Sequence, residues 1–190
     1  VEAIQTLNGW SNEGCTEPTL TLLRDMYAYG TSMPLTGTLT LKGGTHTAKN
    51  VTVAKNADVT FASGSYKGAT IDGTATVKEG VTFTDASVEV NGTLNAKGGT
   101  FTGNVKFNGS SIANISGGSF NNEKKYGGVT FDYNVTGTIT GGTFTFADFY
   151  TTKVKLSGGT FTMIKTNGDR KLADLLAEGA AYYGASDNQA

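Results

Sequence analysis

The chain has one cysteine, Cys15, and two prolines, Pro18 and Pro34, among its 190 residues. A single cysteine excludes an internal disulfide bond. Because no histidine partner is evident for a reactive thiol, we expect Cys15 to lie buried or half-buried in a terminal cap. The scarcity of cysteine and proline favours a secreted bacterial protein stabilised by strand stacking over an extracellular domain held by disulfide bonds.

Charge of one sign and long apolar runs are also scarce. The formal net charge is −1, from 15 basic and 16 acidic residues, so the chain lacks the basic stripe that DNA or RNA binding requires. No apolar run approaches the ~20 residues of a membrane-spanning helix. We therefore expect no nucleic-acid partner and no membrane insertion. Only 37% of the residues are hydrophobic, which fits a thin apolar column better than a round core.

Threonine and glycine are abundant instead, with 31 and 27 residues respectively. Many of them fall in a four-residue phrase, Gly-Gly-Thr-Phe or a close variant, that recurs along the chain. Its copies occupy residues 43–46, 63–66, 98–101, 117–120, 141–144 and 158–161. Successive copies are 17 to 24 residues apart, except for one gap of 35 residues with Gly80 near its middle. A period of ~19 residues is typical of a solenoid.

Short runs of alternating apolar and polar residues, such as Val51-Thr52-Val53, lie between the phrases and predict strands. We interpret the phrase as a corner. Its glycines permit positive φ, its aromatic residue points inward, and its flanking threonines point outward. His46 takes the aromatic place in the first copy and should stack in the same way. A β-sandwich made of hairpins is the alternative, but it does not explain why one phrase returns every ~19 residues.

We therefore predict an all-β fold, a right-handed parallel β-helix of about seven rungs with short helical caps at both ends. The β-helix should span residues 36–165. Residues 1–35 should form the N-terminal cap, in which a helix starts at Glu17-Pro18 and ends at Gly30. An uncapped solenoid end is an open sheet edge that invites aggregation, which is the reason to expect caps.

Residues 166–190 should form a C-terminal cap and linker. A helix is predicted from Asp169, placed to cap its N-terminus, to Gly179, placed to end it. Leu172, Leu175 and Leu176 would share the face that closes the stack. Residues 181–183 are then expected to add an edge strand.

The repeated phrase, running into Lys-Leu-Ala-Asp-Leu-Leu-Ala-Glu-Gly and a tyrosine pair in residues 171–183, resembles the β-helical regions of large surface proteins of Gram-positive anaerobes, notably gut clostridia. The resemblance spans residues 36–183. It implies a monomeric domain of a longer, secreted cell-surface protein. It also implies an adhesin-type, non-catalytic role as a spacer or as a module that binds a host glycoprotein or immunoglobulin. No ligand residue carries over, because the resemblance includes no binding motif.

A carbohydrate-binding or polysaccharide-degrading β-helix is the alternative function. Inverting hydrolysis needs carboxylates gathered on one face, and a lyase needs a base near acids that bind Ca²⁺. Asp132 and Asp148 come closest to one period, and the two arginines, Arg24 and Arg170, lie in the predicted caps. We therefore predict no catalytic residue, no metal site and no cofactor. The acids of the solenoid, which form no cluster at rung spacing, are Asp58, Asp72, Glu79, Asp85, Glu89, Glu123, Asp132 and Asp148.

Outward threonines on a flat solenoid can also order ice-like water. That activity requires a constant rung length, and the phrases are spaced unevenly, at 17 to 24 residues. The uneven spacing therefore disfavours ice binding.

The best candidate for a binding surface is the stretch where the repeat is least regular. The longest single rung, of 24 residues, contains a polar insertion at residues 121–128 that should loop out of the stack. Loops on a rigid scaffold commonly carry recognition, and aromatic residues with polar neighbours make good contact anchors. The alternative is that the nearby rings fill corners or pack on the C-terminal cap. The residues predicted to contact a host protein or glycan are Lys124, Lys125, Tyr126, Tyr133, Phe149 and Tyr150.

Overall fold

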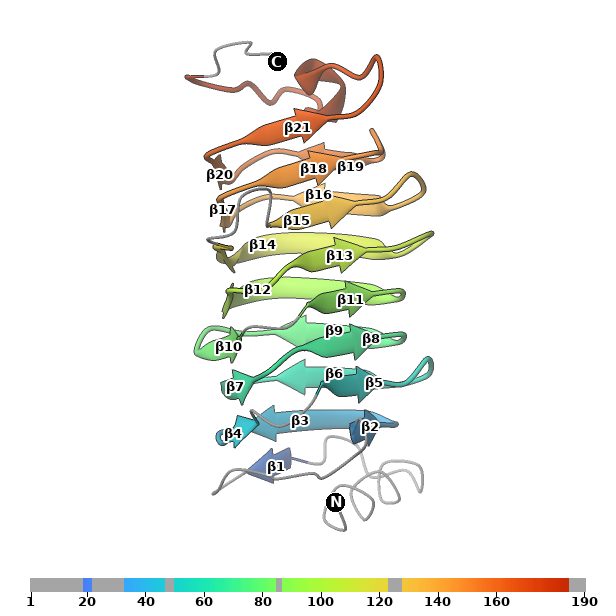
Figure 1. Cartoon of the computed structure of the whole chain (residues 1–190), viewed down its shortest axis with the longest axis vertical. Coiled ribbons are helices and arrows are strands. Elements are labelled where there is room, and N and C mark those ends of the chain that lie inside the picture. Colours follow the sequence, from blue (N-terminus) through green and yellow to red (C-terminus); the bar gives the residue numbers. More distant parts are fainter. Residues whose placement is uncertain (1–18, 22–32, 47–49, 85–86, 123–127, 185–190) are drawn as a thin grey trace.

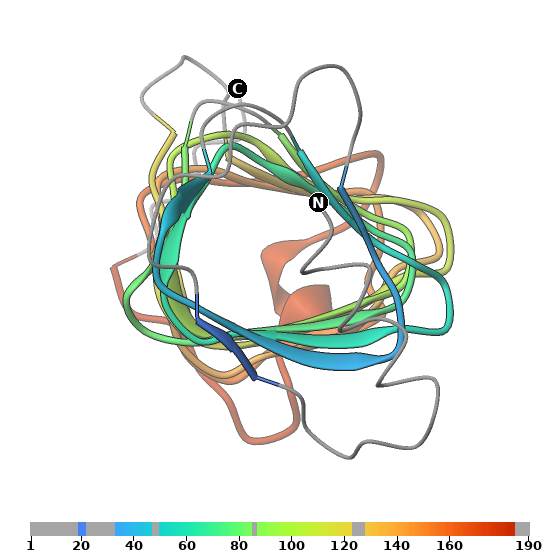
Figure 2. The same ribbon diagram turned by 90° about the horizontal axis from the view of Figure 1, so that it is seen from below.

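The computed structural model describes residues 19–21, 33–46, 50–84, 87–122 and 128–184 of the chain. This part winds into a β-solenoid of parallel, stacked coils, with 53% of its residues in strands and about six turns. Figure 1 shows the coils piled along one axis, and Figure 2, seen along that axis, shows them superposed around a common outline. The all-β parallel β-helix predicted from the repeat is confirmed. The number of turns is close to the expected number of rungs.

The coils have three faces, and among the described residues every coil after the first contributes one strand, or half of a long strand, to each face. The strands of the first face are Thr19–Thr21 (β1), Thr38–Lys42 (β3), Asp58–Phe61 (β6), Thr74–Val77 (β9), the first half of Thr93–Phe101 (β12), the first half of Ile112–Phe120 (β14), Thr136–Ile139 (β16) and Val154–Leu156 (β19). The strands of the second face are Thr45–His46 (β4), Gly64–Tyr66 (β7), Val81–Phe83 (β10), the second halves of β12 and β14, Thr143–Phe144 (β17) and Thr160–Phe161 (β20). Because β12 and β14 run through the corner, these two faces form one 13-stranded sheet.

The third face is an eight-stranded parallel sheet. Its strands are Met33–Leu35 (β2), Val51–Val53 (β5), Ala69–Ile71 (β8), Val88–Val90 (β11), Val105–Phe107 (β13), Val129–Phe131 (β15), Ala147–Phe149 (β18) and Ile164–Thr166 (β21). In most of these three-residue strands the first and third residues are buried and the middle one is not. This period-two alternation is the pattern that the sequence predicts for short strands with one face on a core.

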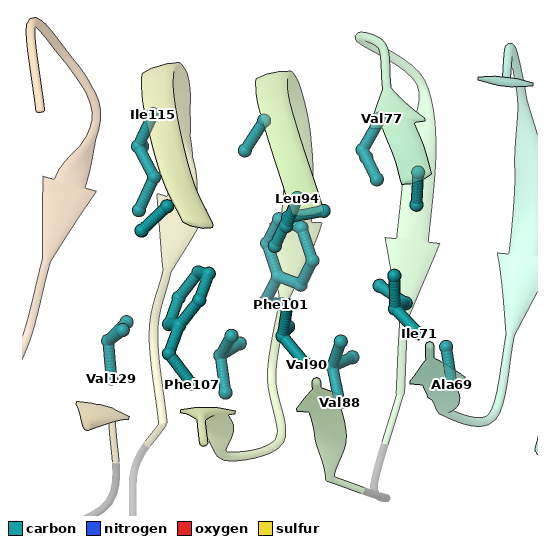
Figure 3. Close-up of a cluster of buried hydrophobic side chains, with 14 of the residues drawn as sticks. Ala69, Ile71, Val77, Val88, Val90, Leu94, Phe101, Phe107, Ile115 and Val129 are labelled. Atoms are coloured by element: carbon teal, nitrogen blue, oxygen red, sulfur yellow. The ribbon is translucent and has the colours of Figure 1, made fainter. Parts of the chain in front are cut away.

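Side chains of like kind stack from coil to coil in the interior. Figure 3 shows Leu94, Ile115 and Val77 from the first face and Phe107 and Val90 from the third face pointing into the space between the sheets. One aromatic column follows the second face, with ring centroids 4.5 to 5.6 Å apart. Its members are His46, Tyr66, Phe83, Phe101, Phe120, Phe144 and Phe161. This spacing follows from the distance of ~4.8 Å between neighbouring strands, so every ring lies against the next.

The predicted stacking of His46 is confirmed, because its ring lies 5.1 Å from that of Tyr66 and is buried. Burial also raises the pKa of the Tyr66 phenol well above its usual value, and its O–H donates to the Ser63 carbonyl at 3.2 Å. A second column, not predicted from the phrase, stacks Phe107, Phe131 and Phe149 on the third face, at 5.1 and 4.6 Å.

The glycines of the phrase form the corner between the first and second faces, as predicted. Gly118, for example, has φ of 101°, and a Cβ there would lie 2.7 Å from the Gly98 carbonyl oxygen of the preceding coil. The outward residues that follow the glycines stay in register from one end of the second face to the other, despite the uneven spacing of the phrases. They are Thr45, Ser65, Thr82, Thr100, Ser119, Thr143 and Thr160. Between β12 and β14, for example, the register shifts only around Lys97, where both strands pass through the corner.

The N-terminal residues that the structure describes belong to the sheets. β1 pairs in parallel with β3, with Leu20 opposite Leu41, and β2 pairs with β5. The helix predicted from Glu17-Pro18 is therefore wrong at Thr19–Thr21, and the sheets begin before Thr36. The reason is that Thr-Leu-Thr also alternates with period two, and pairing with β3 satisfies its backbone groups. The rest of that predicted helix, with Cys15 and Arg24, lies outside the described residues.

The C-terminal cap is smaller than predicted. A single 3-10 turn, Leu172–Leu175 (η1), replaces the helix from Asp169 to Gly179, and Asp174 accepts a hydrogen bond from the Lys171 N–H at 2.8 Å. Residues 181–183 are not a strand. Instead Leu176 bridges to Leu156, and the Ala177 N–H donates to the Leu156 carbonyl at 2.9 Å. The free edge of the last coil competes with the helix for these backbone groups. The three leucines do face the core: Leu175 is buried, and Leu172 and Leu176 pack against it.

Candidate binding surface

The structure separates the predicted contact residues into three groups. Lys124, Lys125 and Tyr126 lie outside the described residues. Phe149 is fully buried and stacks on Phe131, so its prediction as a surface contact is wrong. The reason is its place in β18, where it is the register partner of Phe131 and therefore faces inward. Tyr133 and Tyr150 remain, and the structure brings them together.

The corner after the third face positions both tyrosines. The first residue after each third-face strand donates its backbone N–H to the carbonyl of the last residue of the third-face strand in the preceding coil. These residues form a column along the corner: Ala54, Asp72, Asn91, Asn108, Asp132, Tyr150 and Asn167. Tyr150 thus lies one coil after Asp132, and Tyr133 follows Asp132 at the tip of the same corner. The two rings are 5.4 Å apart with an angle of 60° between their planes. Tyr133 is 59% exposed and Tyr150 is half-buried, so the exposed Tyr133 ring packs against the less exposed Tyr150 ring.

Arg170, from the last described coil, contacts the Tyr133 ring. Its guanidinium carbon lies 5.7 Å from the centre of the Tyr133 ring, within the range of a cation–π interaction. The Arg170 Nη1 donates to the Asn167 carbonyl, and the Arg170 carbonyl accepts from the Thr166 hydroxyl at 2.8 Å. We call Tyr133, Tyr150 and Arg170 the tyrosine patch. The sequence predicts Arg170 only as a charge on the cap surface.

A polar cluster on the third face holds the strand that leads to Arg170. Asp148, only 8% exposed, accepts from the side-chain amide of Asn167 and lies 3.5 Å from the Lys165 ammonium. Asp148 and Lys165 are register partners in β18 and β21. The Lys165 side chain is about half exposed, so the ion pair contributes at most about 1 kcal/mol. The hydrogen bond from the Asn167 side-chain amide to Asp148 has the greater role, because the Asn167 backbone carbonyl also accepts the hydrogen bond from the Arg170 guanidinium.

Asp132 and Asp148, the two acids closest to one period, do not lie opposite each other on neighbouring strands. Asp148 lies opposite Thr130, so it is not the register partner of Asp132, which instead accepts from the Tyr133 N–H at 2.8 Å. Asp72 accepts from the Asn91 amide at 2.7 Å, in the same corner column. Among the described residues, no three His, Cys, Asp or Glu side chains are placed together to hold a metal ion. Asp85 and Glu123 lie outside the described residues.

Comparison of the chain with protein-family models, with curated proteins and with solved structures finds no match. The described part of the chain contains no helix with the length and hydrophobicity needed to span a membrane. The functional assignment therefore depends on the solenoid and on the chemistry of the tyrosine patch. That patch offers exposed ring surface, two phenol hydroxyls and one guanidinium within a small area. These groups can cover apolar surface on a partner and bind its carboxylates or carbonyls.

Proposed function

We propose that this domain is a non-catalytic binding module of a secreted bacterial cell-surface protein, in which the tyrosine patch binds a host protein. The observation that carries the proposal is the Tyr133 ring, which is 59% exposed and contacts both Tyr150 and Arg170. Tyrosine and arginine are enriched among the residues that dominate the energy of protein interfaces. An exposed ring already ordered by two neighbours loses little conformational freedom on binding.

The solenoid supports this role as a rigid support. Its strands pair in parallel from β1 to β21, and its aromatic column continues through the described coils, so a partner bound at one corner meets a stiff surface. Such a rod both spaces a binding surface and presents it. The resemblance to β-helical regions of Gram-positive surface proteins suggests an adhesin, with a host glycoprotein or immunoglobulin as the partner.

The proposal is tested by capture of host proteins from serum and mucosal secretions on the immobilised domain, followed by affinity measurement with the purified partner. Truncation of one interface anchor costs about 2 kcal/mol or more, so we expect Tyr133→Ala and Arg170→Ala each to raise the Kd about thirtyfold. Tyr182→Ala and Tyr183→Ala are the matched controls, because both rings are exposed but lie outside the tyrosine patch. Thermal melting verifies that each variant is folded. An unchanged Kd in the Tyr133→Ala/Tyr150→Ala double variant would reject the patch as the binding surface.

A further inference from the structure

We infer a second binding site, independent of the tyrosine patch, in which a linear neutral polysaccharide lies along the solenoid axis on the first face. The site is a shallow groove across the three successive coils of β12, β14 and β16. The residues that line it are Asn95, Lys97, Asn114, Ile115, Ser116, Thr138 and Thr140, of which Ile115 is buried. Asn95, Asn114 and Thr138 are register partners, so they form one row along the axis.

The groove continues over the corner onto the second face. A second hollow shares Lys97 and Ser116 with the first and extends to Thr100 and Ser119. The corner glycines lie between the first-face pair, Lys97 and Ser116, and the second-face pair, Thr100 and Ser119. They carry no side chain and so leave the hollow open. At Gly117, for example, a Cβ would lie 2.7 Å from the Lys97 carbonyl oxygen. The coil stacking therefore keeps the floor of the groove free of side chains.

The central amides are already ordered. The Asn114 side-chain nitrogen donates to the Asn95 side-chain oxygen at 2.9 Å, and both residues are half-buried. An amide has two donor hydrogens and an oxygen with two lone pairs, so each side chain keeps capacity for further hydrogen bonds. Because the amides are held in place before binding, a ligand hydroxyl that meets them incurs a smaller entropy cost.

An exposed apolar side chain lies two residues along β14 from the amide row, next to the hollow and outside its lining. Ile112 is 40% exposed and lies two residues before Asn114, on the same outward face of β14. It interrupts a row that is otherwise polar: Thr38, Asp58, Thr74, Thr93, Ile112 and Thr136 are successive register partners. Amides and hydroxyls next to one apolar side chain match a pyranose ring, which has hydroxyls at its edge and C–H groups on its faces.

The geometry and the charge favour a neutral polymer over other partners. Groups in one row repeat at the coil spacing of ~4.8 Å, which is close to the advance per sugar in an extended polysaccharide, so each coil can meet one sugar. Lys97 and Glu79, both exposed, line the second hollow with opposite charges, which does not favour a polyanion. None of the side chains lining the two hollows is aromatic, methionine or arginine, the types enriched in protein interfaces.

The test is affinity electrophoresis in native gels that contain hydroxyethylcellulose, barley mixed-linkage β-glucan, xylan or polygalacturonate. We expect at least one of the three neutral polymers to retard the wild-type domain. The variants are Ser116→Trp, which fills the groove with an exposed ring, and Asn95→Ala/Asn114→Ala, which removes the ordered amides. Loss of two hydrogen bonds should raise the apparent Kd about tenfold or more. Lys106→Trp, an exposed position in β13 on the third face, is the control for the tryptophan.

Three results would overturn the inference: no retardation by any neutral polymer, retardation by polygalacturonate alone, or equal retardation of the wild type and the Asn95→Ala/Asn114→Ala variant. The double alanine variant decides the outcome if Ser116→Trp does not fold. The Tyr133→Ala/Tyr150→Ala variant should be retarded like the wild type. Its behaviour separates this site from the tyrosine patch, so that either proposal can fail without the other.

Discussion

At the scale of single residues, Ser111 differs from the residues at the equivalent position of the neighbouring coils, because it carries a polar side chain. Its side chain is fully buried, and among the described residues its hydroxyl has no hydrogen-bond partner. The equivalent positions in neighbouring coils are Ala57, Gly73, Gly92 and Val135, which carry an apolar side chain or none. A buried hydroxyl without a partner loses its bonds to water on folding and gains nothing in return.

Ser111→Ala should therefore stabilise the domain by about 1 kcal/mol, because it removes an unpaired buried hydroxyl and leaves the backbone bonds of this residue unchanged. Ser63→Ala is the matched control. Its hydroxyl accepts from the Gly43 N–H at 2.9 Å, so its loss should destabilise by a similar amount. Urea unfolding of the three proteins measures both changes. Destabilisation by Ser111→Ala would mean that this hydroxyl has a bond partner in solution.

Individual residues also show what a repeat can and cannot predict. The phrase places its glycines, its aromatic residues and its outward threonines correctly, because one set of interactions recurs in every coil. It does not reveal the second aromatic column. Aligning residues 105–107, 129–131 and 147–149 would have placed Phe149 inward with Phe107 and Phe131. Tyr133 and Tyr150 are predictable as neighbours because they lie about one rung apart, whereas Arg170 reaches Tyr133 only through the path of the chain after β21.

At the scale of elements, β16 shows how closely the backbones of neighbouring coils approach each other. Gly137 lies inside this strand with φ of 143°, and a Cβ there would lie 1.9 Å from the Ala113 carbonyl oxygen of β14. Both the backbone conformation and the contact with β14 exclude a side chain. The sequence alone reads Val-Thr-Gly-Thr-Ile as an ordinary strand with one glycine.

Gly137→Ala should destabilise the domain by about 3 kcal/mol or more, since it combines backbone strain with a clash between strands. The control is Gly109→Ala, which also changes a residue with positive φ, 52°, but has no atom within 4 Å of the added Cβ. That variant should lose only about 1 kcal/mol, the cost of a left-handed conformation. Thermal unfolding by circular dichroism compares the two. Equal losses would show that β14 and β16 can move apart to make room.

The termini show where element prediction fails. Leucine periodicity at residues 172–176 predicts a helix, but the open edge of β19 takes the Ala177 N–H and limits the helix to one turn. At the other end, a segment predicted as helix contributes β1 to the first face. In both places, pairing with an unpaired strand edge outweighs a modest local helix propensity. Such edges exist only once the coils are stacked, so a local pattern of residues does not reveal them.

At the scale of the whole molecule, stability is carried along one axis. Each coil contacts only the coils before and after it, so stability is close to a sum of contributions from single coils and from the interfaces between neighbours. A defect in the middle of such a stack removes two interfaces, whereas a defect at the end removes one. The aromatic column provides both cases: the Phe120 ring lies 4.6 Å from Phe101 and 4.8 Å from Phe144, and the Phe161 ring has Phe144 at 4.5 Å.

Phe120→Ala should destabilise the domain by about 3–5 kcal/mol, because a fully buried ring is replaced by a cavity between two coils. Phe161→Ala should cost about half as much, since its ring is only half-buried at the end of the column. Urea unfolding followed by circular dichroism gives both free energies. We further expect the transition of Phe120→Ala to broaden, with a lower m-value, as the two halves of the stack begin to unfold separately. A Phe161→Ala loss as large as that of Phe120→Ala would contradict the nearest-neighbour description.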